Sequence, residues 1–483
     1  MRKSTCLIIA LMIATSFNIN AQLIISDAIS VTDMDNSYGR KNPKIAVNAN
    51  GEIIVFWMRT GNEAFFISTL SDGAFSLPVQ IPFGGLNPDL WSGSLGPNMA
   101  AQGDDVYVTF EVYGDAIYVV HSSDGGITWN DPVAAFIPPA GRRATIPIIA
   151  VDGDGQPYIA YVNTNTSEGD ARYGMVRSTD FGATFLDEVD VSIESAGAEV
   201  CECCNGHIAI ADNGDVYVAF RNNDANLRDI WLARSTDGGE TFSSAFDVDE
   251  TDWIINACPT NGPHFSIVDG EIVTAFFSGA GSDGNAVYYS TFDTQNSIAG
   301  ETLHLPYSNE SSSNQNRPRV AGSGDTLAIV WQESFEGSTE IAMNVSTMGS
   351  AGLSDASFLL TDLSSNQQYP SILFSNAAFH VVYDDAASGT VMYQEVSFGT
   401  LGVVSEEKER FQIGPNPCER YLSIKRESSE TSEITITDML GRITQKTIIY
   451  GQSIQLDLSD LNPGLYFVSI DGERRNAQKL ILQ

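Results

Sequence analysis

The chain has 483 residues, of which 61 are acidic and 25 are basic, and its formal net charge is −36. That charge argues against a protein that binds nucleic acid by neutralising phosphates, and the 10% aromatic content argues against a disordered chain. After the first 21 residues no apolar run is long enough to predict a membrane span in the mature chain.

Residues 1–21 have the pattern of an export signal peptide. Arg2 and Lys3 supply the positive start, residues 7–14 (LIIALMIA) form the apolar stretch, and small residues precede Gln22. We expect this segment to be removed together with Cys6. The mature chain would then lie in a compartment where disulfides form.

A repeated pattern covers residues 22–400. Each copy starts with a proline or glycine, continues with a short apolar strand and a turn, and ends 13 or 14 residues later in an aromatic residue. Successive copies start 50 to 59 residues apart, at Pro43, Pro97, Pro147, Gly206, Pro263, Pro318 and Pro370.

A repeat of that length with short strands and tight turns is typical of one four-stranded propeller blade. One blade cannot bury both faces of its sheet, so consecutive blades must pack around an axis. We therefore predict an all-β chain, a seven-bladed β-propeller followed by a small C-terminal β-sandwich. The last repeat has only three obvious strands, and residues 23–26 are expected to add its outer strand and close the ring.

A second motif occurs three times, at residues 122–129, 178–185 and 235–242. Each copy has a serine, an aspartate two residues later, a glycine and a terminal aromatic residue. Its aspartates, Asp124, Asp180 and Asp237, are suited to bonding turn amides. This motif resembles the Asp-box, or BNR repeat, of sialidase-like propellers. The resemblance implies a structural role between the third and fourth strands, on the face opposite the usual propeller site.

The residue after each repeat start is expected on the innermost strand, where a propeller binds its ligand. Six of these seven residues are polar, and two are histidines in neighbouring blades, His207 and His264. They predict either a solvated channel lining or a binding or catalytic pocket. Basic residues at blade entrances suggest an anionic ligand, although pairing with nearby carboxylates is the alternative. The candidates are Arg40, Lys44, Arg142, Arg143, Arg221, Arg317 and Arg319.

Four cysteines precede the two histidines. Cys201, Cys203 and Cys204 lie before His207, and Cys258 lies before His264. In an exported protein two disulfides are the default, one of which would join blades four and five. A zinc or copper site and a redox-active pair remain open.

No cofactor is assigned from the sequence. Residues 152–155 (DGDG) have calcium-ligand character, but they fall where every repeat makes its first hairpin turn, so turn chemistry explains them without calcium.

The charge distribution predicts a domain boundary near residue 400. Residues 22–400 have 49 acidic and 13 basic side chains, whereas residues 401–483 have 12 and 10. The charged stretch at 401–411 is a linker sequence. Residues 412–483 alternate apolar and polar residues between turns, which predicts about seven strands.

This tail resembles the C-terminal sorting domain of the type IX secretion system, in its PNP opening, its LDLSDL and GLYFVSI segments and its terminal KLI. The resemblance implies that the type IX machinery is a partner. It also implies passage through the periplasm and across the outer membrane, with release or surface attachment.

Function is weighed between two classes. Resemblance to sialidase-like propellers implies a glycoside hydrolase or polysaccharide lyase acting on acidic carbohydrate, with His207, His264 and Tyr369 as candidate catalytic residues. Sialidase activity itself is disfavoured, because the expected arginine motif near the N-terminus is missing and sialidases have six blades. The alternative is a non-catalytic glycan-binding or adhesion propeller at the cell surface.

Overall fold

The computed structural model describes residues 22–31, 40–59, 64–90, 95–197, 199–281, 284–308, 313–335, 337–354, 356–361, 366–399, 411–426, 431–438, 442–470 and 478–483. Within these residues the regular structure is β-strand, apart from one 3₁₀ turn, η1 (Ala351–Ser354). The expected signal peptide and almost all of the expected linker lie outside the described residues. The chain divides into two compact units, Met1–Gly399 and Thr400–Gln483.

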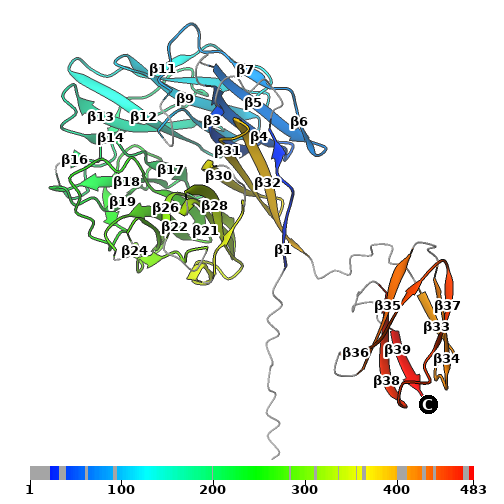
Figure 1. Cartoon of the computed structure of the whole chain (residues 1–483). Coiled ribbons are helices and arrows are strands. Elements are labelled where there is room, and N and C mark those ends of the chain that lie inside the picture. Colours follow the sequence, from blue (N-terminus) through cyan, green and yellow to red (C-terminus); the bar gives the residue numbers. More distant parts are fainter. Residues whose placement is uncertain are drawn as a thin grey trace, which may run out of the picture. The chain divides into compact units, whose positions relative to one another are not determined.

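The described strands of the first unit form seven antiparallel sheets of four or five strands (Figure 1). Their first strands are β3 (Arg40–Val47), β8 (Asn98–Gln102), β12 (Arg142–Val151), β17 (His207–Ile210), β21 (His264–Val268), β26 (Asn314–Ser323) and β30 (Gln367–Ser375). The second strands are β4 (Ile53–Arg59), β9 (Asp105–Val112), β13 (Pro157–Asn165), β18 (Val216–Asn223), β22 (Glu271–Ser278), β27 (Thr326–Phe335) and β31 (Ala378–Asp385).

The third strands are β5 (Ala64–Ser71), β10 (Ala116–Ser122), β14 (Arg172–Arg177), β19 (Ile230–Ser235), β23 (Ala286–Asp293), β28 (Ser338–Ser346) and β32 (Thr390–Gly399). Shorter strands complete the sheets: β6 (Ala74–Phe75), β7 (Val79–Ile81), β11 (Val133–Phe136), β15 (Val189–Asp190), β16 (Glu199–Val200), β20 (Ser244–Asp247), β24 (Ile298–Ala299), β25 (Leu303–His304) and β29 (Phe358–Leu359).

The first strands contact one another in a closed sequence. β3 contacts β8, and the contacts continue through β12, β17, β21, β26 and β30 back to β3. Seven clusters of buried hydrophobic residues alternate with the described sheets, and each cluster takes its side chains from two neighbouring sheets. The aromatic residue that ends each repeat lies in a second strand and is buried. The repeat therefore buries both faces of every sheet against its neighbours.

The N-terminal strand completes the last sheet, as the sequence predicted. β1 (Gln22–Ile25) pairs antiparallel with β32, with Leu23 opposite Phe398 and Ile25 opposite Val396. A second short strand, β2 (Ile29–Ser30), also pairs with β32. The first and last segments of this unit thus share one sheet, which covers an edge that would otherwise be free to pair with another chain.

Four first-strand regions contain the same backbone irregularity. Asn42, Ile146, Arg317 and Tyr369 each precede the proline of their repeat and have φ between 53° and 57°. The pairing register with the second strand shifts at each of these places. A left-handed conformation before proline is unfavourable for residues other than glycine, by about 1–3 kcal/mol. Neighbouring sheets must therefore hold these residues in place.

The second unit has two sheets that share one hydrophobic core. One consists of β33 (Phe411–Gly414), β34 (Tyr421–Arg426) and β37 (Ser453–Asp457). The other consists of β35 (Ser432–Asp438), β36 (Ile443–Ile449), β38 (Gly464–Ile470) and β39 (Gln478–Leu482). Leu422 and Ile424 from the first sheet pack with Ile434, Val468 and Leu480 from the second.

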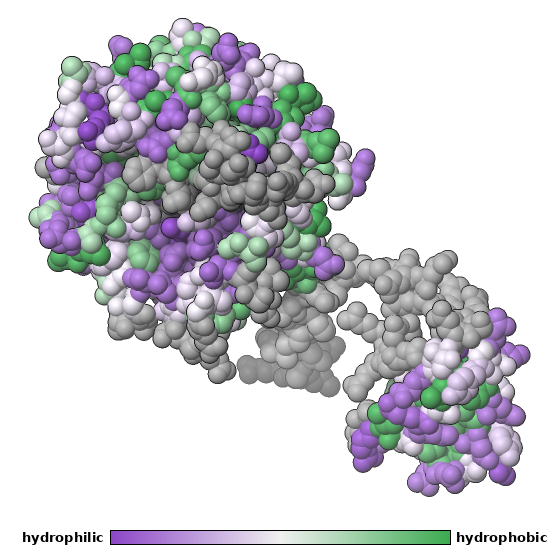
Figure 2. Space-filling model, turned by 45° about the horizontal axis from the view of Figure 1, so that its top comes forward, coloured by the Kyte–Doolittle hydropathy of each residue, from purple (hydrophilic) through white to green (hydrophobic). Residues whose placement is uncertain are grey.

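Among the described residues, no helix is long and apolar enough to cross a membrane. Figure 2 shows hydrophilic residues over much of the visible face of the first unit, in keeping with its acidic composition.

Candidate functional site

Four residues at the position after the repeat start come together in the first unit: Lys44, His207, His264 and Arg319. They lie on the first strands of the first, fourth, fifth and sixth sheets. Lys44 and Arg319 interact electrostatically, although their sheets are not neighbours in the ring. Side chains from such separated strands meet only if they point towards the space that the first strands surround. These four residues are called the axial cluster below.

The two histidines of the axial cluster are stacked. Their ring centroids lie 3.8 Å apart at an interplanar angle of 32°. Nδ1 of His207 accepts a hydrogen bond from the backbone N–H of Phe265, and Nδ1 of His264 accepts one from Val320. In a neutral imidazole whose Nδ1 is an acceptor, the proton is on Nε2. Each ring therefore has an N–H donor left for a ligand and no free lone pair with which to abstract a proton.

Burial and neighbouring cations keep both histidines neutral. Burial, with the charge of Arg319, lowers the pKa of His207 to about 3. Burial lowers the pKa of His264 well below its usual value, with further contributions from His207, Arg319 and Lys44. A general base needs a pKa near the working pH and a free lone pair. The catalytic roles expected for His207 and His264 therefore lack both requirements.

Lys44 and Arg319 are cations held in unfavourable surroundings. Burial and, to a smaller extent, the nearby Arg319 lower the pKa of Lys44 to about 7, while Asp384 opposes the shift. Nζ of Lys44 donates to the side-chain oxygen of Asn42. Burial and then Arg317 lower the pKa of Arg319 to about 10. The cluster thus concentrates positive charge where solvation is weak, and an anion would relieve this repulsion.

Arg317 and Tyr369 lie beside the axial cluster. The guanidinium carbon of Arg317 is 4.8 Å from the centroid of the Tyr369 ring, and both residues have the left-handed conformation described above. The backbone N–H of Tyr369 donates to Oε1 of Gln332 at 2.9 Å, which ties this strained residue to the preceding sheet. The charge of Arg317 lowers the pKa of Arg319, so this pair interacts electrostatically with the axial cluster.

Arg142 and Arg143 are not brought to the cluster. Arg142 donates to the side chain and carbonyl of Asp170 and to Asn163. Arg143 is 3.8 Å from Glu168 and lies over the ring of Tyr113. For these two arginines the alternative considered from the sequence, pairing with nearby acidic residues, describes the structure better. The side chain of Arg40 lies outside the described part of the chain.

Arg221 has a structural environment. It is fully buried, with 0% exposure, and its guanidinium donates to the carbonyls of Arg228, Phe277 and Asn261. It therefore joins the second strand of the fourth sheet to the fifth sheet. No part of this side chain is exposed to a ligand, so we correct the expectation that Arg221 contacts substrate.

The three repeated aspartates all organise turns. Oδ1 of Asp124 accepts from the N–H groups of Ile127 and Thr128, and Oδ2 accepts from the Thr128 hydroxyl. The same hydroxyl and amide contacts occur at Asp180 with Thr184 and at Asp237 with Thr241. Each turn lies between the third and fourth strand of its sheet. These contacts give the aspartates a structural role.

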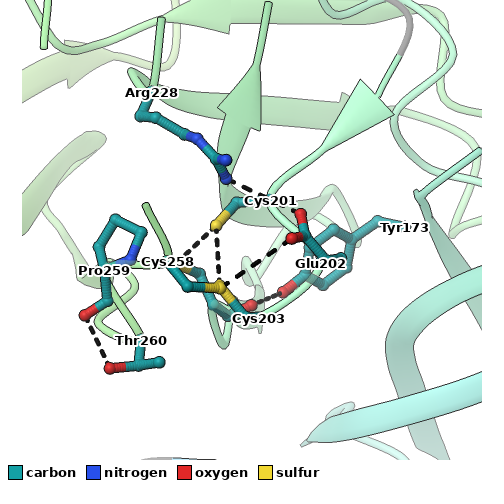
Figure 3. The surroundings of a disulfide bond; sticks show 9 residues. Tyr173, Cys201, Glu202, Cys203, Arg228, Cys258, Pro259 and Thr260 are labelled. Atoms are coloured by element: carbon teal, nitrogen blue, oxygen red, sulfur yellow. Dashed lines mark hydrogen bonds and ion pairs between the residues drawn. A yellow bond between two sulfur atoms is a disulfide. The ribbon is translucent and has the colours of Figure 1, made fainter. Parts of the chain in front are cut away.

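The cysteine cluster joins the loop between β16 and β17 of the fourth sheet to the loop before β21, the first strand of the fifth sheet. Figure 3 shows its surroundings. Cys203 and Cys258 form a disulfide across 55 residues, which confirms the expected disulfide between these two loops. Cys201 and Cys204 are buried thiols whose Sγ atoms are 2.8 Å apart. The Sγ atom of Cys201 is also 3.6 Å from that of Cys203. A sulfur in a disulfide is not a thiolate ligand, so Cys203 would bind a metal only after reduction.

Asp152 organises the first turn of its sheet. Its Oδ1 accepts from the N–H groups of Asp154 and Gln156, and the N–H of Gly155 donates to its carbonyl. This is the turn chemistry that the sequence favoured over calcium binding.

A group of aspartates was missed by sequence reasoning. Asp229 and Asp249 are buried and lie near Asp247, and the charges of Asp249 and Asp247 both raise the pKa of Asp229. Burial and these neighbours raise the pKa of Asp229 to about 7, and burial raises that of Asp247 to about 6. Asp247 and Asp249 stand close together in the sequence, but only the pairing of β19 with β20 adds Asp229.

The tail matches a known family. Residues 412–483 match the secretion system C-terminal sorting domain, which confirms the type IX resemblance. This domain directs the chain to the outer cell surface or the extracellular space. No match to the chain is found among curated proteins.

Several solved structures are similar at low sequence identity. A protein of unknown function from Dyadobacter fermentans is 14% identical, with a TM-score of 0.46 over 67% of this chain and 98% of that one. PorZ, a surface component of the type IX secretion system of Porphyromonas gingivalis, is 13% identical, with a TM-score of 0.44 over 91% and 59%. The NanB sialidase of Streptococcus pneumoniae is 14% identical, with a TM-score of 0.40 over 77% and 70%. We base no functional argument on similarities of this size.

Proposed function

We propose that the protein is an exported seven-bladed β-propeller that binds acidic carbohydrate at the axial cluster. The seven sheets are its blades, the turns at Asp124, Asp180 and Asp237 are Asp-boxes, and the tail is a small β-sandwich that serves type IX secretion. The closed sequence of contacts between first strands supports the blade count.

One observation carries the binding proposal. Lys44, His207, His264 and Arg319 come from four separate sheets and interact with one another. Each offers hydrogen-bond donors, and the two histidines have used their acceptor nitrogens on backbone N–H groups. A set made of donors and positive charge suits a carboxylate or a sulfate ester, which offers only acceptors.

The acidic composition strengthens this argument. Residues 22–400 have 49 acidic and only 13 basic side chains. Lys44, Arg317 and Arg319 nevertheless lie close together, and repulsion between these cations lowers the pKa of Lys44 and of Arg319. Pairing each of these cations with a carboxylate, as Arg142 is paired with Asp170, would avoid this repulsion. Among the described residues, Asp384 is the one acidic group that acts on the pKa of Lys44, and an acidic sugar would add a further anion beside these three cations. Its ring also carries hydroxyls that hydrogen bond to neighbouring polar groups.

A second candidate, a polysaccharide lyase, is favoured by the contact between Arg317 and Tyr369. A lyase neutralises the substrate carboxylate with a cation and removes the neighbouring proton with a base. Arg319 would serve the first purpose, and the phenol of Tyr369, whose ring lies beside the Arg317 guanidinium, would serve the second. The histidines would then orient the carboxylate rather than act as bases.

The test is titration of the full chain with polygalacturonate, alginate and dextran sulfate, with neutral dextran as the control ligand. We expect binding of at least one acidic polymer, and a loss of about tenfold or more in affinity in Arg319→Gln. Arg142→Gln is the matched control, because that arginine is paired with Asp170. Equal affinities of wild type and Arg319→Gln for every acidic polymer would refute the proposal.

The lyase candidate is tested in the same samples by the absorbance of unsaturated uronate. Tyr369→Phe is expected to abolish its formation while binding is retained. Binding without any such product leaves the non-catalytic function as the conclusion.

A further inference from the structure

Two of the four clustered cysteines, Cys201 and Cys204, form no disulfide in the structure, yet their sulfur atoms lie closer together than a normal non-bonded contact. Cys201 and Cys204 are both fully buried, and their Sγ atoms are 2.8 Å apart. A turn brings them together, because the backbone N–H of Cys204 donates to the carbonyl of Cys201. Figure 3 shows Cys201 beside the Cys203–Cys258 disulfide.

The distance between the two sulfur atoms distinguishes a shared metal ion from a disulfide. Two thiolates on one tetrahedral zinc ion, each at about 2.3 Å, lie roughly 3.8 Å apart. A disulfide has an S–S length of about 2.05 Å. The observed 2.8 Å is too short for two ligands of one zinc ion, and a small movement would bring the sulfurs to bonding distance.

The surroundings favour a reactive thiol at Cys201. A hydrogen bond with Cys204 and the charges of Arg221 and Arg228 lower the pKa of Cys201 to about 7, against the effect of burial. Burial raises the pKa of Cys204 well above its usual value. One thiolate beside one thiol, with two residues between them in a Cys-X-X-Cys arrangement, is the pattern of an oxidisable pair.

We propose that Cys201 and Cys204 form a second disulfide in the exported protein, so that all four clustered cysteines are paired. The oxidant is a disulfide of a periplasmic thiol oxidase or of a small molecule. The Cys201 thiolate attacks one sulfur of that disulfide, and the other sulfur leaves as a thiolate, which takes up a proton from solvent. Cys204 then gives up its proton and attacks Cys201 Sγ, so the Cys201–Cys204 bond forms, the mixed disulfide breaks, and the second sulfur of the oxidant leaves with that proton; the oxidant is thus reduced to two thiols.

This pair occupies a position that supports the axial cluster. The backbone N–H of Cys201 donates to the Arg221 carbonyl, and the Cys204 carbonyl accepts from the Tyr173 hydroxyl at 2.9 Å. His207 follows three residues later. The second bond would fix the turn internally, whereas the Cys203–Cys258 bond joins it to the neighbouring sheet.

The test is thiol mapping of the full chain purified without reductant. The protein is denatured in N-ethylmaleimide and digested with trypsin, which leaves Cys201, Cys203 and Cys204 on one peptide (178–221) and Cys258 on another (235–319). We expect the two peptides to be joined and to carry no maleimide. Two maleimide groups on peptide 178–221 would overturn the proposal, as would one tightly bound zinc or copper ion per chain.

A double variant assigns the pairing. In Cys203→Ser/Cys258→Ser the bond expected between Cys201 and Cys204 remains, so peptide 178–221 is expected alone, unlabelled and two hydrogen atoms lighter than its reduced form. Cys201→Ser is the matched control, in which Cys204 must take up one maleimide. If the double variant does not fold, the count of labelled thiols in the wild-type chain still decides whether the second bond exists.

Discussion

The rings of His207 and His264 are stacked with their centroids 3.8 Å apart, although 56 residues separate them in the sequence. They occupy the same position in two neighbouring repeats, and each ring accepts a backbone N–H from the next sheet. The stack is therefore a product of the repeat. It directs two N–H donors to the place where Lys44 and Arg319 bring positive charge.

Binding of an acidic polymer is expected to weaken as the pH rises from 6 to 9. The pKa of Lys44 is lowered to about 7, mainly by burial, so its positive charge is lost over this range. Affinity measured by calorimetry should fall by about tenfold in the wild type. Lys44→Met should bind weakly at pH 6 and show little change towards pH 9. A wild-type affinity that does not vary with pH would contradict this assignment.

Acid is expected to destabilise the first unit through the two histidines. The pKa of His207 in the folded state is about 3, below its usual value, so the unfolded chain binds more protons between about pH 6.5 and 3. Stability should therefore fall as the pH decreases through this window. In His207→Asn, urea unfolding should show a smaller fall between pH 7 and pH 4.5. His121→Asn, outside the axial cluster, is the control, and an equal fall in all three proteins would argue against this origin.

Neutralising one buried aspartate is expected to stabilise the protein above neutral pH. Burial and the charges of Asp249 and Asp247 raise the pKa of Asp229 to about 7, so ionisation costs stability as the pH rises through that value. Asp229→Asn keeps an acceptor for the Trp253 N–H and should add on the order of 1–2 kcal/mol to the free energy of unfolding at pH 8. The gain should disappear at pH 4. The exposed Asp212→Asn is the comparison, for which no such gain is expected.

Loss of the Cys203–Cys258 disulfide is expected to destabilise the first unit. This bond closes a loop across 55 residues, which corresponds to about 4 kcal/mol in the chain-entropy description. Cys203→Ser/Cys258→Ser should therefore unfold at a lower urea concentration than the wild type. Cys418→Ser, in the second unit, serves as the control for cysteine replacement. Unchanged unfolding of the double variant would mean that the bond adds no stability.

Removal of the N-terminal strand is expected to open the ring. Deletion of residues 22–26 removes the pairing of β1 with β32 and exposes that edge. A loss on the order of 4 kcal/mol is expected from about four ladder hydrogen bonds, together with concentration-dependent association through the edge. Thermal unfolding and light scattering measure the two effects. Deletion of 400–483, a separate compact unit, should leave the unfolding midpoint of the first unit unchanged.

Much of the architecture was predictable because it depends on local patterns. The start residues, the closing aromatics and the Ser-x-Asp turns are short-range features, and each occurs in the structure at the expected place in its sheet. Even the pairing of β1 with β32 followed from counting strands in the last repeat. The sorting domain was predictable for the same reason, since its motifs lie within one short segment.

Which residues belong to the candidate site depended on the tertiary structure. In the sequence, Arg221, Arg142 and Arg319 are equivalent arginines near strand ends. In the structure Arg221 is fully buried among carbonyls, Arg142 is paired with Asp170, and Arg319 lies near other cations. The acceptor use of the histidine nitrogens also depends on the backbone of the next sheet.

The amino-acid order alone determined which strands form, how many sheets follow one another and where the chain is sent, because hydrophobic periodicity and turn residues act between neighbours in the sequence. Only the closed ring decided which polar groups meet. Electrostatic and hydrogen-bonding energies depend on distance and burial, and for Lys44 and Arg319 both are set by strands that lie 275 residues apart in the chain.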